Sequence, residues 1–276
     1  MIPFDFITEW RQVAPWIDDT QIEQDLILSR ALVEMFSQTE VAEALAFRGG
    51  TALFKLFLTP APRYSEDIDL VQITAEPIGP CLTSIRRVLD PWLGDPKRAF
   101  KEGGVTLIYR VQSEGSPSLP IRLKIEINTR EHFNVFGLQE RAFQVESRWF
   151  SGSASIQTYH LDELMGTKLR ALYQRKKGRD LFDLWITSRR GSVDNDRIVE
   201  CFRCYLEQTK LQVSRAEFEA NLSRKLVDPR FLNDIAPLLA PGCPWDIDGA
   251  ARYAREDLLP RLPGAPWKGE DHGVTA

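Results

Sequence analysis

Two aspartates, Asp67 and Asp69, stand one residue apart in the stretch SEDIDLVQI, where apolar and polar residues alternate. Such alternation predicts a β-strand, and residues i and i+2 of a strand point to the same face. The two carboxylates would therefore lie side by side and repel each other unless a cation sits between them. Oxygen ligands of this kind suit Mg²⁺. The alternative interpretation is an exposed strand whose two acids are simply solvated.

A third carboxylate, Glu126, lies in IRLKIEIN, whose apolar residues face one way and polar residues the other. If this strand neighbours the first, three carboxylates converge, and three can hold two divalent ions that activate an attacking oxygen and stabilise a leaving one. The alternative for Glu126 is a salt bridge to Arg122 or Lys124, which could equally bind phosphate. The pattern thus predicts Asp67, Asp69 and Glu126 as ligands of Mg²⁺ or Mn²⁺.

Two adjacent glycines, Gly49 and Gly50, precede an apolar stretch that we expect to form a helix from about Thr51 to Leu58. A turn without side chains lets backbone N–H groups approach a phosphate closely, and a helix N-terminus adds partial positive charge. Thr51 would cap that helix or hydrogen-bond a phosphate oxygen. Gly-Gly alone usually marks a turn, but a turn, a helix and paired aspartates in one short unit predict an anion site beside a metal site.

The bulk properties are those of an ordinary globular protein, with 276 residues, 43% hydrophobic and 27% charged. No apolar run approaches the roughly 18 residues that a membrane span needs. The N-terminus also lacks the order of a signal peptide, so we expect a cytoplasmic protein without a membrane partner. Because the net charge is −4, a nucleic-acid partner would need a local basic patch. Cys201 and Cys204 form a lone CxxC, which we interpret as ordinary thiols.

The expected elements divide the chain into a mixed α/β domain, residues 1–157, and a helical domain, residues 158–276. The first domain carries the paired aspartates, Glu126 and the two glycines. Helices are expected at 21–38, 51–58 and 81–93, and strands at 44–47, 65–73, 105–113 and 121–128.

These motifs resemble those of the AbiEii/AbiGii nucleotidyltransferase toxins, a family within the polymerase-beta-like nucleotidyltransferase superfamily. Four blocks carry the resemblance over roughly residues 20 to 190. They are the helix EQDLILSRALVEMF, the glycine block GGT with RYSEDIDL, the strand LKIEIN, and KLRAL followed by RDLFDL. Many relatives have serine in place of Thr51, so the hydroxyl is kept.

The resemblance implies an α+β fold: a polymerase-beta-like core, in which helices flank a mixed sheet, with an added C-terminal helical lobe. It also implies that a nucleoside triphosphate is bound with Mg²⁺ and that its nucleotidyl group passes to an acceptor hydroxyl, with release of pyrophosphate. Relatives act as toxins neutralised by a partner protein, and some modify the 3′ end of tRNA. We therefore expect a toxin of a toxin–antitoxin or phage-defence (abortive infection) system, with RNA as acceptor and a cognate antitoxin.

Lys168 falls on the apolar stripe of its expected helix, so by pattern it either snorkels outward or is aimed at an anion. The resemblance implies that it contacts the triphosphate and that Lys168 and Asp180 contribute to the site. Asp180 and Asp183 share one helix face. As site residues, Asp180 would orient Lys168 or assist proton transfer and Asp183 would belong to the nucleotide site. Otherwise the two acids pair with Arg179 or Lys176.

The stretch Arg170–Arg179 is the densest basic patch, and we expect RNA contacts there, although a charge run is usually a solvated face. Arg63 and Ser65, which flank Asp67, would touch phosphate or fix the loop. Further basic candidates are Arg86, Arg87, Lys97 and Arg98.

Two other function classes remain open at this stage. One is a glycosyltransferase that uses its DxD motif to bind the metal of a nucleotide sugar, which incubation with nucleotide sugars would detect. The other is a non-catalytic module that binds a nucleotide or a partner, which would show triphosphate binding without turnover.

Overall fold

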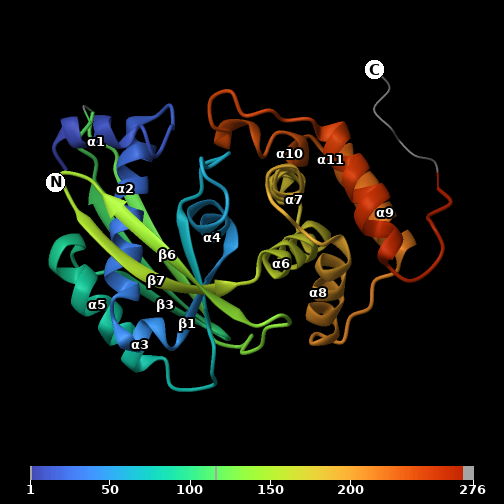
Figure 1. Cartoon of the computed structure of the whole chain (residues 1–276), viewed down its shortest axis with the longest axis horizontal. Helices are drawn as coiled ribbons and strands as arrows, with labels where there is room; N and C mark the ends of the chain where they lie inside the picture. The colour runs from blue at the N-terminus through green and yellow to red at the C-terminus, as the bar shows by residue number, and fades with distance from the viewer. Residues whose placement is uncertain (1, 116, 270–276) are drawn as a thin grey trace. The chain divides into compact units, whose positions relative to one another are not determined.

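The computed structural model describes residues 2–115 and 117–269 and divides into two compact units, Met1–Tyr159 and His160–Ala276 (Figure 1). The first unit holds a mixed sheet with flanking helices, and the second is helical. The predicted α+β class is therefore confirmed. The boundary expected at residues 157/158 falls inside the last strand of the sheet, which ends at Tyr159.

The first unit consists of five helices and seven strands among its described residues. Its helices are α1 (Phe4–Trp10), α2 (Asp19–Phe36), α3 (Thr39–Ala42), α4 (Gly49–Leu56) and α5 (Gly79–Leu93). Its strands are β1 (Leu45–Arg48), β2 (Asp67–Gln72), β3 (Lys97–Lys101), β4 (Gly104–Gln112), β5 (Pro120–Asn128), β6 (Leu138–Glu146) and β7 (Ser151–Tyr159).

The seven strands form one sheet in the order β3-β4-β5-β2-β1-β7-β6. The short strand β2 lies in the middle, antiparallel to β1 and parallel to β5. A parallel pair leaves the side chains of both strands in register on a common face. The strand that carries Glu126 is thus a direct neighbour of the strand that carries the two aspartates.

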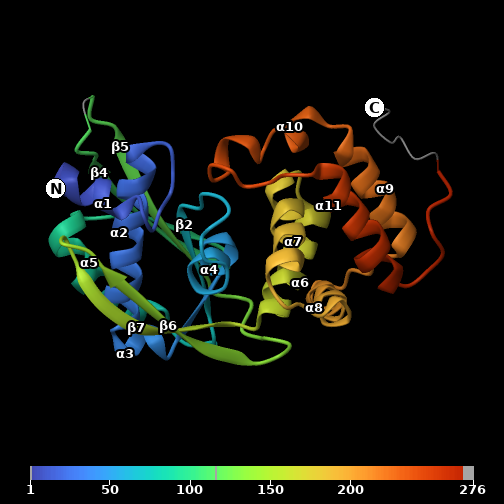
Figure 2. The same ribbon diagram turned by 45° about the horizontal axis from the view of Figure 1, so that its top comes forward.

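The two faces of this sheet differ because the strand residues alternate. On β4 and β5 the buried apolar residues, among them Tyr109 and Ile125, face the core, where the Tyr109 hydroxyl donates to Asp90 of α5 at 2.8 Å. The opposite face carries the polar residues of both strands, which are half-buried or exposed except for the buried Thr106. In Figures 1 and 2, α2 and α5 run beside the strands of this unit. The alternation therefore fixes which face is free for chemistry.

Helix α2 is buried on more of its faces than the single apolar stripe of an amphipathic helix would bury. Its N-cap Asp18 accepts a hydrogen bond from the backbone of Thr20, which explains why the helix begins before residue 21. Even its polar Asp25 is buried, because it accepts from the Trp10 indole at 2.9 Å and pairs with Lys55 at 2.7 Å. These two partners offset the free-energy cost of burying the carboxylate in the core.

The second unit is built from helices among its described residues. Its first helix begins at Leu161, shortly after Tyr159, which still pairs with β6. The helices are α6 (Leu161–Gln174), α7 (Gly178–Arg190), α8 (Asn195–Glu207), α9 (Arg215–Leu226), α10 (Pro229–Leu232), η1 (Ala236–Leu238), α11 (Ile247–Tyr253), the π-helix η2 (Ala254–Leu258) and η3 (Leu259–Arg261).

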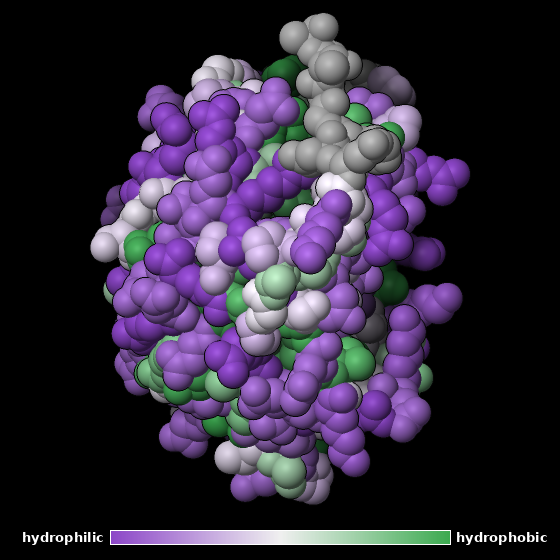
Figure 3. Space-filling model, turned by 90° about the vertical axis from the view of Figure 1, so that its right-hand side faces the viewer, coloured by the Kyte–Doolittle hydropathy of each residue, from purple (hydrophilic) through white to green (hydrophobic). Residues whose placement is uncertain are grey.

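The surface in Figure 3 is mostly hydrophilic, with hydrophobic residues in small separate patches. Within the described residues, no helix combines the length and the apolar character needed to cross a bilayer. All four cysteines are unbonded, and burial raises the pKa of the Cys201 thiol, so it stays protonated at neutral pH.

Candidate active site

The two aspartates of β2 project from the polar face of the sheet, as their spacing predicted. Both are half-buried, whereas Ile68 and Leu70 between and beyond them are fully buried. In the strand register, Asp69 lies opposite Glu126 of β5. On the other side of β2, Asp69 lies opposite Arg48 of β1. A row of one cation and two carboxylates thus crosses the middle of the sheet.

Gly49 is required at its position because it lies directly against Asp69. A Cβ atom built on Gly49 would overlap with the Asp69 carboxylate, and the backbone at Gly49 has φ +85°, in the left-handed region. At Gly50, an added Cβ would come within 2.7 Å of the Arg63 guanidinium and 3.1 Å of the Ser65 hydroxyl. The absent side chains therefore make room for one acid of the DxD motif and for two polar side chains of the loop before it.

The helix that follows the glycines begins earlier than expected. Helix α4 starts at Gly49 rather than near Thr51, and Arg48 occupies the N-cap position without a side-chain capping bond. The interpretation of Thr51 as the helix cap is therefore wrong. The physical reason is that Gly49 alone supplies the left-handed turn, so the regular helical backbone can begin at once.

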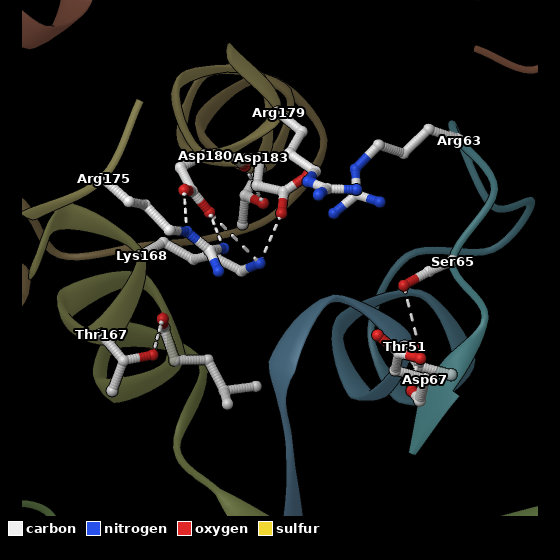
Figure 4. A network of polar contacts seen from close by, with 12 residues as sticks. Thr51, Arg63, Ser65, Asp67, Thr167, Lys168, Arg175, Arg179, Asp180 and Asp183 are labelled. Carbon is white, nitrogen blue, oxygen red and sulfur yellow. Dashed lines mark hydrogen bonds and ion pairs between the residues drawn. The ribbon is translucent and has the colours of Figure 1, made fainter. Parts of the chain in front are cut away.

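The Thr51 hydroxyl ties α4 to the start of β2. It is buried, donates to the backbone carbonyl of Asp67 at 2.6 Å, and lies 2.9 Å from the Ser65 hydroxyl (Figure 4). Because the single hydroxyl hydrogen of Thr51 goes to the carbonyl, Ser65 must donate to Thr51. Thr51 therefore positions the backbone of Asp67, and Ser65 supports Thr51.

Replacing Thr51 by valine should destabilise this unit by roughly 1–3 kcal/mol, because the Asp67 carbonyl and the Ser65 hydroxyl both lose their partner. Thr51→Ser keeps the hydroxyl and should stay close to the wild type. Chemical unfolding of the two variants measures the difference. Equal stability of Thr51→Val and Thr51→Ser would show that the hydroxyl does not hold β2 in place.

A lysine supplies positive charge beside the carboxylates. Lys124 Nζ lies 2.9 Å from a Glu126 oxygen and 3.8 Å from an Asp67 oxygen. Partial burial opposes ionisation of Lys124, but the charges of Glu126, Asp67 and Asp69 together outweigh it, so the pKa of the ammonium group is raised. The salt bridge that was the alternative interpretation of Glu126 is present, with Lys124 rather than Arg122 as the partner.

A cavity of about 270 Å³ opens beside the row of charged residues. Asp69 and Glu126 line it together with Arg48 and Lys101. Gly103 and Gly104 also line this cavity and contribute no side chains to it. The cavity therefore offers carboxylates and cations to the same ligand.

The carboxylates of β2 and β5 are the groups of this site that would bind a divalent cation. No group of three or more His, Cys, Asp or Glu side chains in the described ranges is arranged to hold a metal ion. Asp67 and Asp69 nevertheless offer only oxygen atoms from one strand face, and Glu126 lies in register beside Asp69. Lys124 places an ammonium group between Asp67 and Glu126, so this site already attracts positive charge. The oxygen atoms of Asp67 and Asp69 therefore fit a hard cation, which these two residues would hold.

Arg63 is held firmly before β2. Its guanidinium is buried, donates to the Tyr64 carbonyl at 2.9 Å and lies 4.7 Å from the centre of the Phe54 ring. These contacts fit the interpretation in which Arg63 fixes the loop. They also place the positive charge of Arg63 beside Gly50.

In the second unit, Lys168 of α6 meets the two acids of α7 (Figure 4). Lys168 Nζ lies 2.7 Å from Asp183 and 3.8 Å from Asp180, and both carboxylates are fully buried. Arg175 forms two hydrogen bonds of 2.7 Å with Asp180. Lys168 therefore does not snorkel outward, and the near partner of Lys168 is Asp183. The alternative interpretation paired these acids with Arg179 or Lys176, but the ion pairs that the described residues show are with Lys168 and Arg175.

The basic stretch Arg170–Arg179 connects α6 with α7, and its cations have partners within the second unit. The Arg170 guanidinium lies 4.7 Å from the centre of the Tyr205 ring. Acidic side chains offset much of the charge that the sequence displays here. The ion pairs are Arg175–Asp180, Lys176–Asp228, Lys177–Asp234 and Arg179–Asp234.

Two cations of the cavity were not identified from the sequence. Arg48 lies opposite Asp69 and pairs with Glu131 at 2.5 Å, and Lys101 ends the edge strand β3. Arg48 directly precedes the two glycines, so its position in RGG was the available signal. Lys101 gave none, because a lysine at the end of a short polar strand is common.

A family model described as nucleotidyl transferase AbiEii toxin, type IV TA system, matches residues 30–252. The solved structure of MenT4, a nucleotidyltransferase toxin from Mycobacterium tuberculosis H37Rv, is similar with a TM-score of 0.59 and 16% identity, covering 95% of this chain and 91% of that one. JHP933 from Helicobacter pylori gives a TM-score of 0.52 at 15% identity, covering 87% and 90% of the two chains. No curated protein sequence matches the chain.

Proposed function

Since the chain belongs to the AbiEii family of nucleotidyltransferase toxins of type IV toxin–antitoxin systems, we propose that it transfers a nucleoside monophosphate from a nucleoside triphosphate to RNA, with the 3′ end of tRNA as acceptor. The observation that supports this best is the packing of Gly49 against Asp69, which joins a side-chain-free turn to a carboxylate in register with a second one. A phosphate-binding backbone and a cation-binding group are thereby in contact.

In the proposed reaction, the oxygen of the acceptor hydroxyl attacks the α-phosphorus of the triphosphate. The bond between the α-phosphorus and the bridging oxygen to the β-phosphate breaks, and pyrophosphate leaves with that electron pair. Glu126 accepts the hydroxyl proton. The backbone N–H groups of Gly49 and Gly50 hold the triphosphate, with Arg63 and Ser65 beside Gly50. Such chemistry depends on positioning and charge stabilisation rather than on a covalent nucleophile.

Asp67 and Asp69 would hold Mg²⁺ or Mn²⁺, and Glu126 would complete the site once Lys124 gives up its ion pair. When bound, the cation reduces repulsion between the carboxylates and the phosphates and stabilises the charge of the leaving group. Lys124 is then available to an anionic group of a substrate. We place the reaction in the cytoplasm and expect a cognate antitoxin as protein partner.

The direct test is incubation of the protein with each of the four α-labelled nucleoside triphosphates and total RNA, followed by a gel. Labelled RNA with at least one triphosphate is expected. Membership of a nucleotidyltransferase family favours this reaction over the glycosyltransferase and the non-catalytic module. Absence of labelled RNA with all four triphosphates, together with turnover of a nucleotide sugar, would reverse that order.

For Lys168, we follow the resemblance and propose that its charge serves triphosphate binding in addition to its ion pair with Asp183. Lys168→Met alone should destabilise the second unit by roughly 3–5 kcal/mol, because it removes the cation that lies 2.7 Å from the buried Asp183 carboxylate. The double variant Lys168→Met/Asp183→Leu removes both charges and should fold.

The double variant separates the two roles of Lys168. If Lys168 serves the reaction, the refolded double variant should transfer no label to RNA while its melting temperature stays near that of the wild type. Recovery of activity along with stability would mean that Lys168 is structural only.

A further inference from the structure

The polar face of β3, β4 and β5 carries cations on either side of the carboxylates. Because residues in register across a sheet share a face, the residues on the same face as Asp69 and Glu126 follow from the strand pairing. Glu126 pairs with Thr106 of β4, which pairs with Ala99 of β3. Two residues away from Ala99 in each direction, Lys97 and Lys101 lie on this same face. We name it the catalytic sheet face.

Two arginines lie directly opposite each other on the catalytic sheet face. Arg110 of β4 pairs in register with Arg122 of β5, and both side chains are exposed. Like charges in directly opposed positions destabilise a strand pair. The flanking pairs on this face are Ile108 with Lys124 and Gln112 with Pro120, so neither flanking pair contains an acid. Among the residues that the structure describes, neither arginine forms an ion pair.

The edge strand β3 adds two cations to this face and one to the other. Lys97, Arg98 and Lys101 are exposed, and none of them forms an ion pair within the described part of the chain. Lys97 and Lys101 point to the catalytic sheet face, whereas Arg98 points to the opposite face. Arg98 is therefore a control, on the same strand, for the effect of the direction in which a side chain points.

The other basic candidates differ from these residues in having acidic partners. Arg86 pairs with Asp90 and Asp95, and Arg87 with Glu40. The cations at 175–179 are paired as described above. Among the described residues, the catalytic sheet face therefore carries four cations without an ion pair, Lys97, Lys101, Arg110 and Arg122, beside the carboxylates, in a chain whose net charge is −4.

We propose that the catalytic sheet face is the docking surface for the acceptor RNA, whose phosphates bind Arg110 and Arg122 on one side of the carboxylates and Lys97 and Lys101 toward the sheet edge. A phosphate between Arg110 and Arg122 removes the repulsion between them and replaces it with charge-assisted hydrogen bonds. This inference rests on the proposed function, because it assigns the acceptor of the same reaction to a surface.

The distances suit a strand that ends at the reaction centre. Arg122 precedes Glu126 by four residues, which is about 13 Å along a strand. Lys97 and Lys101 lie two strands from β5, about 10 Å across the sheet. An RNA strand that contacts these cations can place its terminal hydroxyl beside Glu126 without leaving the face.

A simpler account exists for part of this pattern. Lysines on an edge strand prevent pairing with another chain, and exposed arginines are often only solvated. That account predicts no difference between Arg98 and its neighbours on β3, and it leaves the opposed pair Arg110–Arg122 unexplained. The direction of the side chain is therefore the feature to test.

The test is the binding of a short fluorescein-labelled single-stranded RNA, followed by anisotropy over a range of salt concentrations. The variants are Arg110→Gln/Arg122→Gln and Lys97→Gln/Lys101→Gln, with Arg98→Gln as the control on the opposite face. Each double variant should weaken binding about tenfold or more at low salt and lower the slope of log K against log salt by about 1.4, since each phosphate contact contributes about 0.7. Arg98→Gln should bind as the wild type does.

Stability provides a second readout. Because Arg110 and Arg122 repel each other, their replacement by glutamine should leave the melting temperature unchanged or raised, so weaker binding cannot be ascribed to unfolding. An equal effect of Arg98→Gln, unchanged binding by both double variants, or a wild type that does not bind the RNA would each overturn the proposal. Binding that follows the prediction without transfer of labelled nucleotide would instead contradict the proposed function alone.

Discussion

Asp69→Asn lowers the rate of nucleotidyl transfer to RNA by a factor of about 10³ or more, which corresponds to about 4 kcal/mol in the activation barrier. The amide keeps the size of the carboxylate and its place against Gly49, but it removes the negative charge that, in the proposed function, holds the cation. Asp69 lies opposite both Arg48 and Glu126, so the lost charge lies at the centre of the row. The rate is measured as incorporation of α-labelled nucleotide into RNA under single-turnover conditions.

Asp95→Asn is the matched control for this variant. Asp95 belongs to the same unit, is largely exposed and contacts Arg86 at the surface. The same chemical change there should leave the transfer rate unaltered. A wild-type rate for Asp69→Asn, or an equal loss for both variants, would remove Asp69 from the catalytic role.

Gly49→Ala lowers the transfer rate by about 10² even though no reacting group is removed. The added Cβ would overlap with the Asp69 carboxylate, so the acid or the turn must shift. A displacement of about 1 Å at a reaction centre can reduce a rate by that factor. The left-handed backbone at φ +85° adds a stability loss of roughly 1–2 kcal/mol for a residue with a side chain. Transfer assays and chemical unfolding measure the two effects separately.

Gly79→Ala tests whether the effect comes from the position of the glycine. An added Cβ at Gly79, at the start of α5, meets no other atom within 4 Å, so this variant should be active and stable. A fully active Gly49→Ala variant would show that close packing between the turn and Asp69 is unnecessary.

Alternation of apolar and polar residues along the strands was enough to predict the face on which Asp67, Asp69 and Glu126 lie. In β5 the apolar residues from Ile121 to Ile127 are buried in turn and the polar ones are not, so the face of Glu126 followed directly. The same rule placed Asp67 and Asp69 together. What alternation cannot give is the partner of a strand, because pairing depends on residues far apart in the chain. The register of Asp69 with Glu126 therefore needed the structure.

Strands with few apolar residues escaped prediction. β6, LQERAFQVE, and β7, SGSASIQTY, are rich in polar residues, and most of their side chains are half-buried or exposed. Their pairing with each other stabilises them rather than an apolar face of their own. The short strand β3 was overlooked for the same reason, which hid Lys101 and the direction of Lys97.

Runs of basic residues in the sequence did not predict which cations lack an acidic partner in the structure. The stretch 170–179 appeared as the main basic surface, but acids from elsewhere in the second unit, Asp228 and Asp234, pair with three of its cations. Arg110 and Arg122 are isolated cations in their strands and attract no notice in the sequence. Only the strand register brings them face to face.

The most direct measurement compares α-labelled with γ-labelled nucleoside triphosphate in parallel reactions with RNA. Attack on the α-phosphorus at the site of Asp67, Asp69 and Glu126 transfers the α-label to RNA and releases the γ-label as pyrophosphate. The Asp69→Asn variant should neither transfer the α-label nor release the γ-label. Transfer of the γ-label to RNA, or transfer of the α-label by Asp69→Asn at the wild-type rate, would contradict the account.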